Sequence, residues 1–143
     1  MVIDTSALLA ILLDEAERRI YNEAIEAAAS RAMSVANFVE ISIVIEARFG
    51  AEGLRDLDLF IDRAGIEIVQ VDLEQGDLAR RAFSRFGKGR HPAGLNFGDC
   101  FAYALAVARG EPLLYKGEDF SKTDIARGTQ SGAPALVTPG EGR

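Results

Sequence analysis

The segment Leu95-Asn96-Phe97-Gly98-Asp99-Cys100-Phe101-Ala102-Tyr103-Ala104-Leu105-Ala106 begins as a polar turn and continues as an almost wholly apolar helix. Asn96 suits the N-cap position and Asp99 the third helical position, which together form a capping box. The positive potential at a helix start favours the ionised form of Asp99 at neutral pH. The segment therefore predicts a helix with a carboxylate at its N-terminal end.

Short apolar runs rich in branched residues alternate with longer segments of helical period on both sides of this helix. The runs predict buried strands at Val2-Ile3, 32–35, 66–71, 113–115 and 135–137, and the helical segments are 7–13, 20–28, 38–49, 54–61, 78–86 and 101–108. Such alternation predicts an α/β fold with βαβ crossovers and a mainly parallel sheet covered on both faces. In such a sheet the ligand site lies outside the carboxyl ends of the strands.

The bulk properties fit one domain spanning residues 1–143. The chain has 143 residues, 48% of them hydrophobic, and no repeat or linker-like tract. Its start lacks the pattern of a secretory signal, and no apolar run approaches the ~20 residues that span a bilayer. A single cysteine, Cys100, fits a reducing compartment. We expect a soluble, cytoplasmic protein with no membrane association.

Asp4 ends the first apolar pair and is followed by Thr5, Ser6 and an apolar helical run. This order places a carboxylate and two hydroxyls at the carboxyl end of a strand. Helix capping accounts for one of these three side chains, because Asp, Thr and Ser are all good N-caps. Capping alone does not explain why all three follow a buried strand so abruptly.

Glu40 lies between Val39 and Ile41 in a helical segment and is expected to face protein rather than water. A buried carboxylate is costly unless a cation or metal accompanies it. One alternative is an ordinary ion pair with Arg48 or Arg31. The other is a place in a metal site.

Asp119 follows the strand 113–115 across a short turn, where an acidic residue is also common for turn chemistry alone. Together with Asp4, Glu40 and Asp99 it forms a set of four acids that turns do not require. Hard cations prefer carboxylate oxygens, and no histidine or cysteine accompanies the set, so it predicts Mg²⁺, with Mn²⁺ as a substitute. A bound metal activates water and offsets charge on a phosphate, which is a usual route to phosphodiester hydrolysis.

A basic segment precedes Asp99. Residues 78–98 contain no Asp or Glu, although the whole chain has a net charge of −6. The segment could hold the phosphates that flank a scissile phosphodiester, or it could simply be a solvated helix face and loop. Its five cationic candidates are Arg80, Arg81, Arg85, Lys88 and Arg90.

Four stretches, in order along the chain, resemble the PIN domain of VapC-type toxins. They are Val2-Ile3-Asp4-Thr5-Ser6-Ala7, the Glu40 helix ending Glu46-Ala47-Arg48-Phe49-Gly50, the Leu95 to Phe101 stretch, and Leu114-Tyr115-Lys116-Gly117-Glu118-Asp119-Phe120. The match runs from Met1 to about Ile125, and the tail 127–143 resembles the family least.

The resemblance implies an α/β/α sandwich with four to five strands and a Mg²⁺-dependent endoribonuclease, the toxin of a type II toxin–antitoxin (VapBC) system. It makes Asp4 and Asp99 the principal metal ligands, with Glu40 and Asp119 at the second and fourth acidic positions. Thr5 and Ser6 match hydroxyl positions that order the metal site. It also implies a homodimer and a cognate VapB-type antitoxin, which often inhibits through an arginine placed among the acids.

The fourth carboxylate has three candidates, Glu118, Asp119 and Asp124. We favour Asp119 because it directly precedes Phe120, and Asp124 would then support the loop.

Two other functions compete with the nuclease. A phosphorelay receiver-like domain would use Asp4, Asp72 and Lys116, but it leaves Glu40 and Asp99 unexplained. A catalytically idle RNA- or partner-binding module on the same fold is the second, and the presence of all four acids argues against it.

Overall fold

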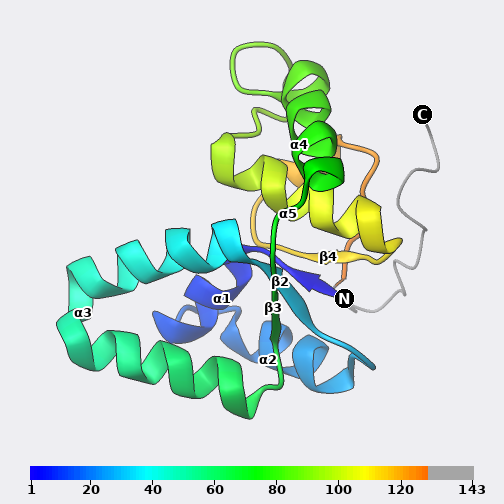
Figure 1. Cartoon of the computed structure of the whole chain (residues 1–143). Helices are drawn as coiled ribbons and strands as arrows, with labels where there is room; N and C mark the ends of the chain where they lie inside the picture. The colour runs from blue at the N-terminus through cyan, green and yellow to red at the C-terminus, as the bar shows by residue number, and fades with distance from the viewer. Residues whose placement is uncertain (129–143) are drawn as a thin grey trace.

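The computed structural model describes residues 1–128, which form one parallel sheet with helices on both faces (Figure 1). The strands are β1 (Val2–Ile3), β2 (Ala32–Ser34), β3 (Glu67–Val69) and β4 (Leu113–Leu114). Their order across the sheet is β3-β2-β1-β4, and every neighbouring pair is parallel. The carboxyl ends of β1, β2 and β4 therefore meet at one edge, with the two middle strands at its centre.

Successive residues of each strand point to opposite faces, and this alternation builds two hydrophobic cores. Val2, Ala32 and Leu113 belong to one core, whereas their sequence neighbours Ile3, Met33 and Leu114 belong to the other. All six side chains are fully buried. The sheet therefore needs a helical layer on each side, as the α/β/α prediction requires.

Helices α4 and α5 cover the first face, and α1, α2 and α3 cover the second (Figure 1). Their bounds are α1 (Thr5–Leu12), α2 (Arg18–Ala27), α3 (Val35–Arg63), α4 (Leu73–Phe86) and α5 (Phe97–Arg109), followed by the 3₁₀ turn η1 (Phe120–Lys122). None of the helices within residues 1–128 is long and apolar enough to cross a membrane.

Helix α3 is two helical rods joined at Gly50, where φ is 64° and ψ is −155°. The rods lie side by side in Figure 1, and the chain reverses direction between them. They correspond to the two segments predicted at 38–49 and 54–61. The sequence prediction of separate helices there is confirmed. Helix α4 starts at Leu73, earlier than the expected residue 78, because Asp72 caps it by accepting a hydrogen bond from the Gln75 N–H at 2.9 Å.

Two of the predicted strands need comment. The strand expected at 66–71 is β3, but it lies at the sheet edge with Glu67 exposed, so the expectation that it is buried was wrong. The strand expected at 135–137 lies outside the described residues.

The β4 edge of the sheet is covered by residues 126–128. The Leu113 N–H donates to Ala126 O, and the Gly128 N–H donates to Leu113 O, each at 2.8 Å. Leu113 and Arg127 thus form a parallel bridge. The chain returns to the sheet after η1 and pairs with the backbone of its last strand.

Candidate active site

Asp4 lies where β1 ends and is the N-cap of α1. Its Oδ2 accepts hydrogen bonds from the Ser6 N–H at 3.0 Å and the Ser6 hydroxyl at 2.5 Å. Only 3% of Asp4 is exposed, and its Oδ1 is buried with no hydrogen-bond partner among residues 1–128. Of the three side chains that could cap this helix, Asp4 does so, and the cap engages only one of its two carboxylate oxygens.

Glu40 lies on the first rod of α3 and faces the start of α1. Its Oε1 accepts from the Thr5 hydroxyl at 2.5 Å and from the Asn37 side-chain amide at 3.3 Å. Arg31 instead donates to backbone carbonyls, among them Ile25 O, and Arg48 lies over the Phe49 ring. The structural ion pair considered as an alternative for Glu40 is therefore not formed.

Asp99 begins α5 in the predicted capping box. Its N–H donates to Asn96 Oδ1 at 2.9 Å, and its Oδ2 accepts from the Asn96 N–H at 3.0 Å. The neighbouring Gly98 faces Glu40 so closely that an added Cβ would lie 2.1 Å from Glu40 Oε2. The absence of a side chain at residue 98 thus allows the carboxylate of α3 to approach the start of α5.

Asn37 joins these two helices, a role that the sequence analysis missed. It is fully buried and donates to both Gly98 O, at 3.0 Å, and Glu40. Its Oδ1 has no hydrogen-bond partner in the part of the chain that the structure describes. The spacing of Asn37 and Glu40, three residues apart on a helix, was the only signal in the sequence.

Asp119 is exposed at the start of η1, and no side-chain capping hydrogen bond holds it. Its two rivals are engaged elsewhere. Glu118 accepts from the Ser121 hydroxyl at 3.1 Å, and Asp124 accepts from the Tyr103 hydroxyl and pairs with Arg85 at 3.5 Å. Of the three candidates, Asp119 is the one whose negative charge contributes to the raised pKa of Asp99.

The electrostatics of Asp4 and Asp99 show that the acids lie close together. Burial, followed by the charges of Asp99 and Glu40, raises the pKa of Asp4 to about 7 despite its bonds to Ser6. Burial, with the charges of Asp119 and Glu40, raises the pKa of Asp99 to about 6. Within residues 1–128, none of the four acids has an ion pair with Lys, Arg or the N-terminus. Full ionisation of the cluster is therefore costly, because no ion-paired cation within residues 1–128 offsets the charges of the four acids.

The residues fit a divalent cation by their chemistry. Two buried oxygens, Asp4 Oδ1 and Asn37 Oδ1, have no hydrogen-bond partner within residues 1–128, and the charges of Asp99 and Glu40 act on Asp4. Hard cations prefer such oxygen ligands. In the described part of the chain no three His, Cys, Asp or Glu side chains already form a group that could hold a metal ion. Thr5, Ser6 and Asn96 orient the carboxylates of Glu40, Asp4 and Asp99 through hydrogen bonds.

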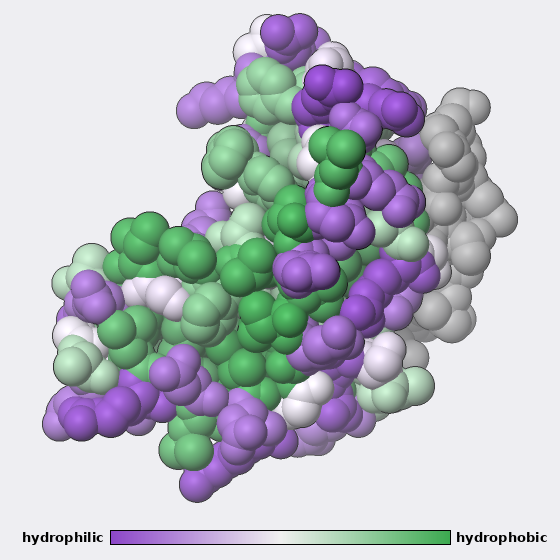
Figure 2. All heavy atoms as spheres, viewed as in Figure 1, coloured by the Kyte–Doolittle hydropathy of each residue, from purple (hydrophilic) through white to green (hydrophobic). Residues whose placement is uncertain are grey.

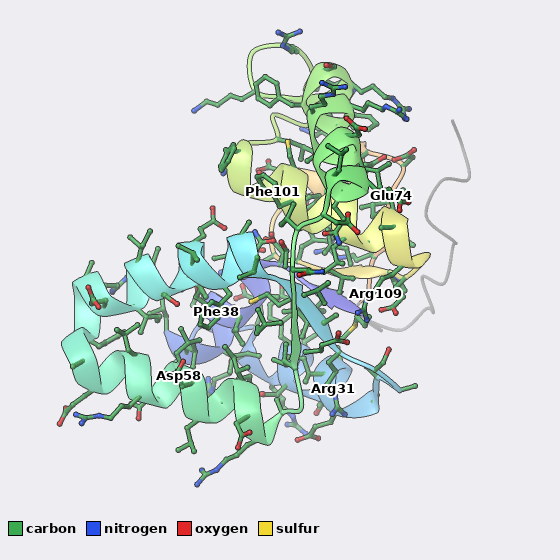
Figure 3. All side chains as sticks on the ribbon, viewed as in Figure 1. Arg31, Phe38, Asp58, Glu74, Phe101 and Arg109 are labelled. Carbon is green, nitrogen blue, oxygen red and sulfur yellow. The ribbon has the colours of Figure 1, made fainter. Side chains whose placement is uncertain are left out.

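The five basic candidates divide into two groups. Arg80 pairs with Asp77 at 3.0 Å, and Arg85 pairs with Asp124. Arg81, Lys88 and Arg90 are exposed and form no ion pair within residues 1–128. Figure 3 shows long side chains projecting from α4 and from the loop that follows it, at the top of the view.

A family model described as PIN domain matches residues 1–126. Ribonuclease VapC30 of Mycobacterium tuberculosis is 56% identical over 126 residues, which cover 88% of this chain and 96% of that protein. Among solved structures, VapC20 of M. tuberculosis, described as a Sarcin-Ricin loop cleaving toxin, aligns with a TM-score of 0.70 at 15% identity over 87% of this chain and 95% of that one. A toxin-antitoxin complex from Klebsiella pneumoniae aligns with a TM-score of 0.64 at 18% identity over 96% of each chain.

Proposed function

Because the chain belongs to the PIN domain family and, within it, to the VapC ribonucleases, we propose that it cuts RNA at a Mg²⁺ site formed by Asp4, Glu40, Asp99 and Asp119. The observation that carries this proposal is the anionic cluster without a countercharge, in which burial and mutual repulsion raise the pKa of Asp4 and Asp99. Mn²⁺ would substitute, since it also takes oxygen ligands.

Each side chain has a distinct part in the proposed site. Asp4 and Asp99 would be the principal ligands, because their positions at the carboxyl end of β1 and the start of α5 are fixed by backbone caps. Glu40 would reach the cation from α3, because Gly98 has no side chain to block its carboxylate. Asp119, which has no capping bond, would complete the set from η1. Thr5 and Ser6 would hold Glu40 and Asp4 in place through their hydroxyls.

A bound divalent ion would supply an activated water and offset charge on the scissile phosphate. The residues of the chain would supply orientation. Asp4 Oδ1, which has no hydrogen-bond donor within residues 1–128, would be free to coordinate the cation, while Ser6 fixes the other oxygen of the same carboxylate. Binding also requires that Asp4 and Asp99 lose their protons, so cleavage should rise with pH through the range of their raised pKa values.

The decisive experiment measures RNA cleavage by the purified chain with Mg²⁺, with Mn²⁺ and with EDTA. We expect cleavage only with a divalent ion, and we expect Asp4→Asn and Asp99→Asn to abolish it while leaving the circular dichroism spectrum unchanged. Asp58→Asn, an exposed acid on α3, is the matched control and should cleave normally. Full metal-dependent cleavage by Asp4→Asn or Asp99→Asn would sink the assignment. A wild-type chain that binds RNA without cutting it would support the idle binding module instead.

A receiver-like function is not supported by the contacts. Lys116 directs its ammonium group to Glu15 and Glu17 rather than to Asp4. Asp72 caps α4 by accepting from the Gln75 N–H. Asp4, Asp72 and Lys116, which would have to act together in a receiver, thus have separate partners.

The partners follow from the same site. Family membership supports a toxin role with a VapB-type antitoxin, and four carboxylates without a countercharge would also accept a guanidinium group from that antitoxin. Exposed apolar residues on the first rod of α3 support a homodimer. Val35, Val39 and Ile43 follow one another at four-residue spacing and are 36%, 50% and 65% exposed. Figure 2 shows apolar side chains gathered over this rod and toward α5.

The RNA backbone would contact Lys88 and Arg90, which have no carboxylate partner within the described residues, more than Arg80 or Arg85, which do. We expect Lys88→Ala with Arg90→Ala, made in the Asp4→Asn background, to weaken RNA binding. The salt dependence should also flatten, because each lost phosphate contact lowers the slope of log affinity against log salt by about 0.7. Arg19→Ala with Arg55→Ala provides a control of equal charge change. Equal slopes of log affinity against log salt for both double variants would mean that the basic segment is only a solvated surface.

A further inference from the structure

Lys116 lies between the end of β4 and the loop that carries Asp119, and its ammonium group reaches across to the α1–α2 connection. It forms ion pairs with Glu15 and Glu17, the second at 3.2 Å. Hydrogen bonds to these two carboxylates raise the pKa of Lys116 above its ordinary value. Glu17 Oε2 is shielded from solvent, and its ion-pair partner is the Lys116 ammonium group. Lys116 is therefore the cation that faces this oxygen.

The backbone of the same residue contacts the candidate active site. The Lys116 N–H donates to Ser6 Oγ at 2.9 Å, and the Ser6 hydroxyl in turn donates to Asp4 Oδ2 at 2.5 Å. The direction of the Ser6 hydroxyl is fixed by this pair of bonds, since its oxygen accepts from Lys116 while its hydrogen goes to Asp4. A shift of the Lys116 backbone would thus be felt at the Asp4 carboxylate.

The same segment sets the position of the fourth acid. Asp119 lies three residues after Lys116, and it has no capping bond of its own. On the far side of Asp119, Phe120 is buried and packs against the Tyr115 ring with centroids 5.1 Å apart. Asp119 is therefore held by its flanks, which are Lys116 on one side and Phe120 on the other.

We propose that Lys116 is a positioning residue for the metal site, one that fastens the β4–η1 loop to the α1–α2 connection through Glu15 and Glu17 and so holds Asp4 and Asp119 in register. This inference rests on the proposed function, because it concerns the acids of that site. Lys116 touches neither substrate nor metal in this role. Its effect passes through Ser6 to Asp4 and through the loop to Asp119.

Whether loss of the Lys116 side chain weakens or strengthens metal binding distinguishes a positioning role from a purely electrostatic effect. Removing a positive charge near four carboxylates should by itself strengthen the binding of a divalent cation. Loss of positioning should weaken it, by roughly tenfold, as found when supporting residues of metal sites are removed. Lys116→Met tests the two effects against each other, and Lys116→Arg keeps the charge and the reach to both carboxylates.

The experiment titrates the full-length chain with Mn²⁺ by calorimetry and measures kcat and KM on a fluorogenic RNA oligonucleotide that the wild type cuts. For Lys116→Met we expect a roughly tenfold higher Kd for Mn²⁺, a kcat that rises again at high Mn²⁺, and an unchanged KM for RNA. Lys116→Arg should restore the Kd. Glu15→Gln, a milder change in the same cluster, should give a smaller shift in the same direction and is informative if Lys116→Met does not fold.

The matched control is Arg19→Met, which removes an exposed ion pair of 2.9 Å with Glu23 on the neighbouring α2. It should leave the Kd for Mn²⁺ unchanged. An unchanged or tighter Kd in Lys116→Met would overturn the inference, as would a Lys116→Arg variant that behaves like Lys116→Met. Loss of thermal stability without a change in Kd would show a merely structural ion pair and would also overturn it. A wild-type chain that binds no Mn²⁺ would instead contradict the metal site itself.

Discussion

Asp4 is almost completely buried, and no Lys or Arg within residues 1–128 forms an ion pair with its carboxylate. Its pKa rises from 3.8 to about 7 on folding, so the folded state binds this proton more tightly than the unfolded state does. The stability of the metal-free protein should therefore fall as pH rises from about 4 to about 7 and level off above that. Removing the charge should remove this loss.

The corresponding variant is Asp4→Asn, which keeps an oxygen that can accept from the Ser6 N–H. In EDTA at pH 8 we expect its free energy of unfolding to exceed that of the wild type by on the order of 4 kcal/mol, with little difference at pH 4. Urea denaturation at both pH values measures this. Asp58→Asn is the exposed control, expected to stay within about 0.5 kcal/mol. Equal stabilities of Asp4→Asn and wild type at pH 8 would show that Asp4 carries no buried charge.

Gly98 tests how closely α3 and α5 must approach. In Gly98→Ala the added Cβ would meet Glu40 Oε2, the far end of a flexible side chain, so we expect Glu40 to swing away while the fold persists. The affinity for Mn²⁺ should fall by roughly tenfold. Gly76→Ala on α4 is the control, because nothing lies within 4 Å of its Cβ, and it should gain up to about 1 kcal/mol from helix propensity. Unaltered Mn²⁺ binding in Gly98→Ala would exclude Glu40 from the site.

For single residues, the sequence predicted the contacts that form between near neighbours in the chain. The caps formed by Asp4 and Asn96 were predictable because each bond spans two or three residues. The partners of Glu40 were not, because Thr5 lies on another helix 35 residues away. The contacts of Lys116 with Glu15, across 101 residues, were hidden for the same reason.

Among the elements, α3 depends on a single residue for its change of direction. Gly50 has φ 64° and ψ −155°, a combination that side chains with a Cβ hardly tolerate. Gly50→Ala has free space around its Cβ, so its whole cost is backbone strain, on the order of 1–3 kcal/mol. Thermal unfolding measures it, with Glu52→Ala as a neighbouring exposed control. No loss of stability in Gly50→Ala would mean that the two rods can join without this conformation.

Periodicity predicted most elements and failed where tertiary position decides. Helix α4 begins five residues before its expected start, since its first turn is polar and the apolar period becomes visible only later. Strand β3 has the branched residues of a buried strand, yet its position at the sheet edge exposes Glu67, which pairs with Arg109 at 3.0 Å. The order of the strands in the sheet determines how deeply each is buried, and a local sequence pattern does not predict that order.

For the whole molecule, the exposed apolar face of α3 predicts self-association. Val39→Asp with Ile43→Asp should convert a dimer into a monomer, because two like charges would be buried against each other across a twofold axis. Size-exclusion chromatography with light scattering measures the mass. Leu73→Asp, at a separate apolar position that is 82% exposed on α4, should leave the mass unchanged. A wild-type chain that is monomeric at all concentrations would contradict this prediction.

The return of residues 126–128 to β4 leaves the sheet with unequal borders. One border is occupied by the chain's own backbone, and the other, β3, has a charged residue facing solvent. Open strand borders recruit strands from other molecules, and charge discourages this. Shortening the chain to end at Thr123 would uncover the Leu113 N–H and carbonyl beside an uncharged, fully apolar strand. For protein engineering, we therefore expect a chain without residues 126–128 to aggregate more readily, so an expressed form should retain them.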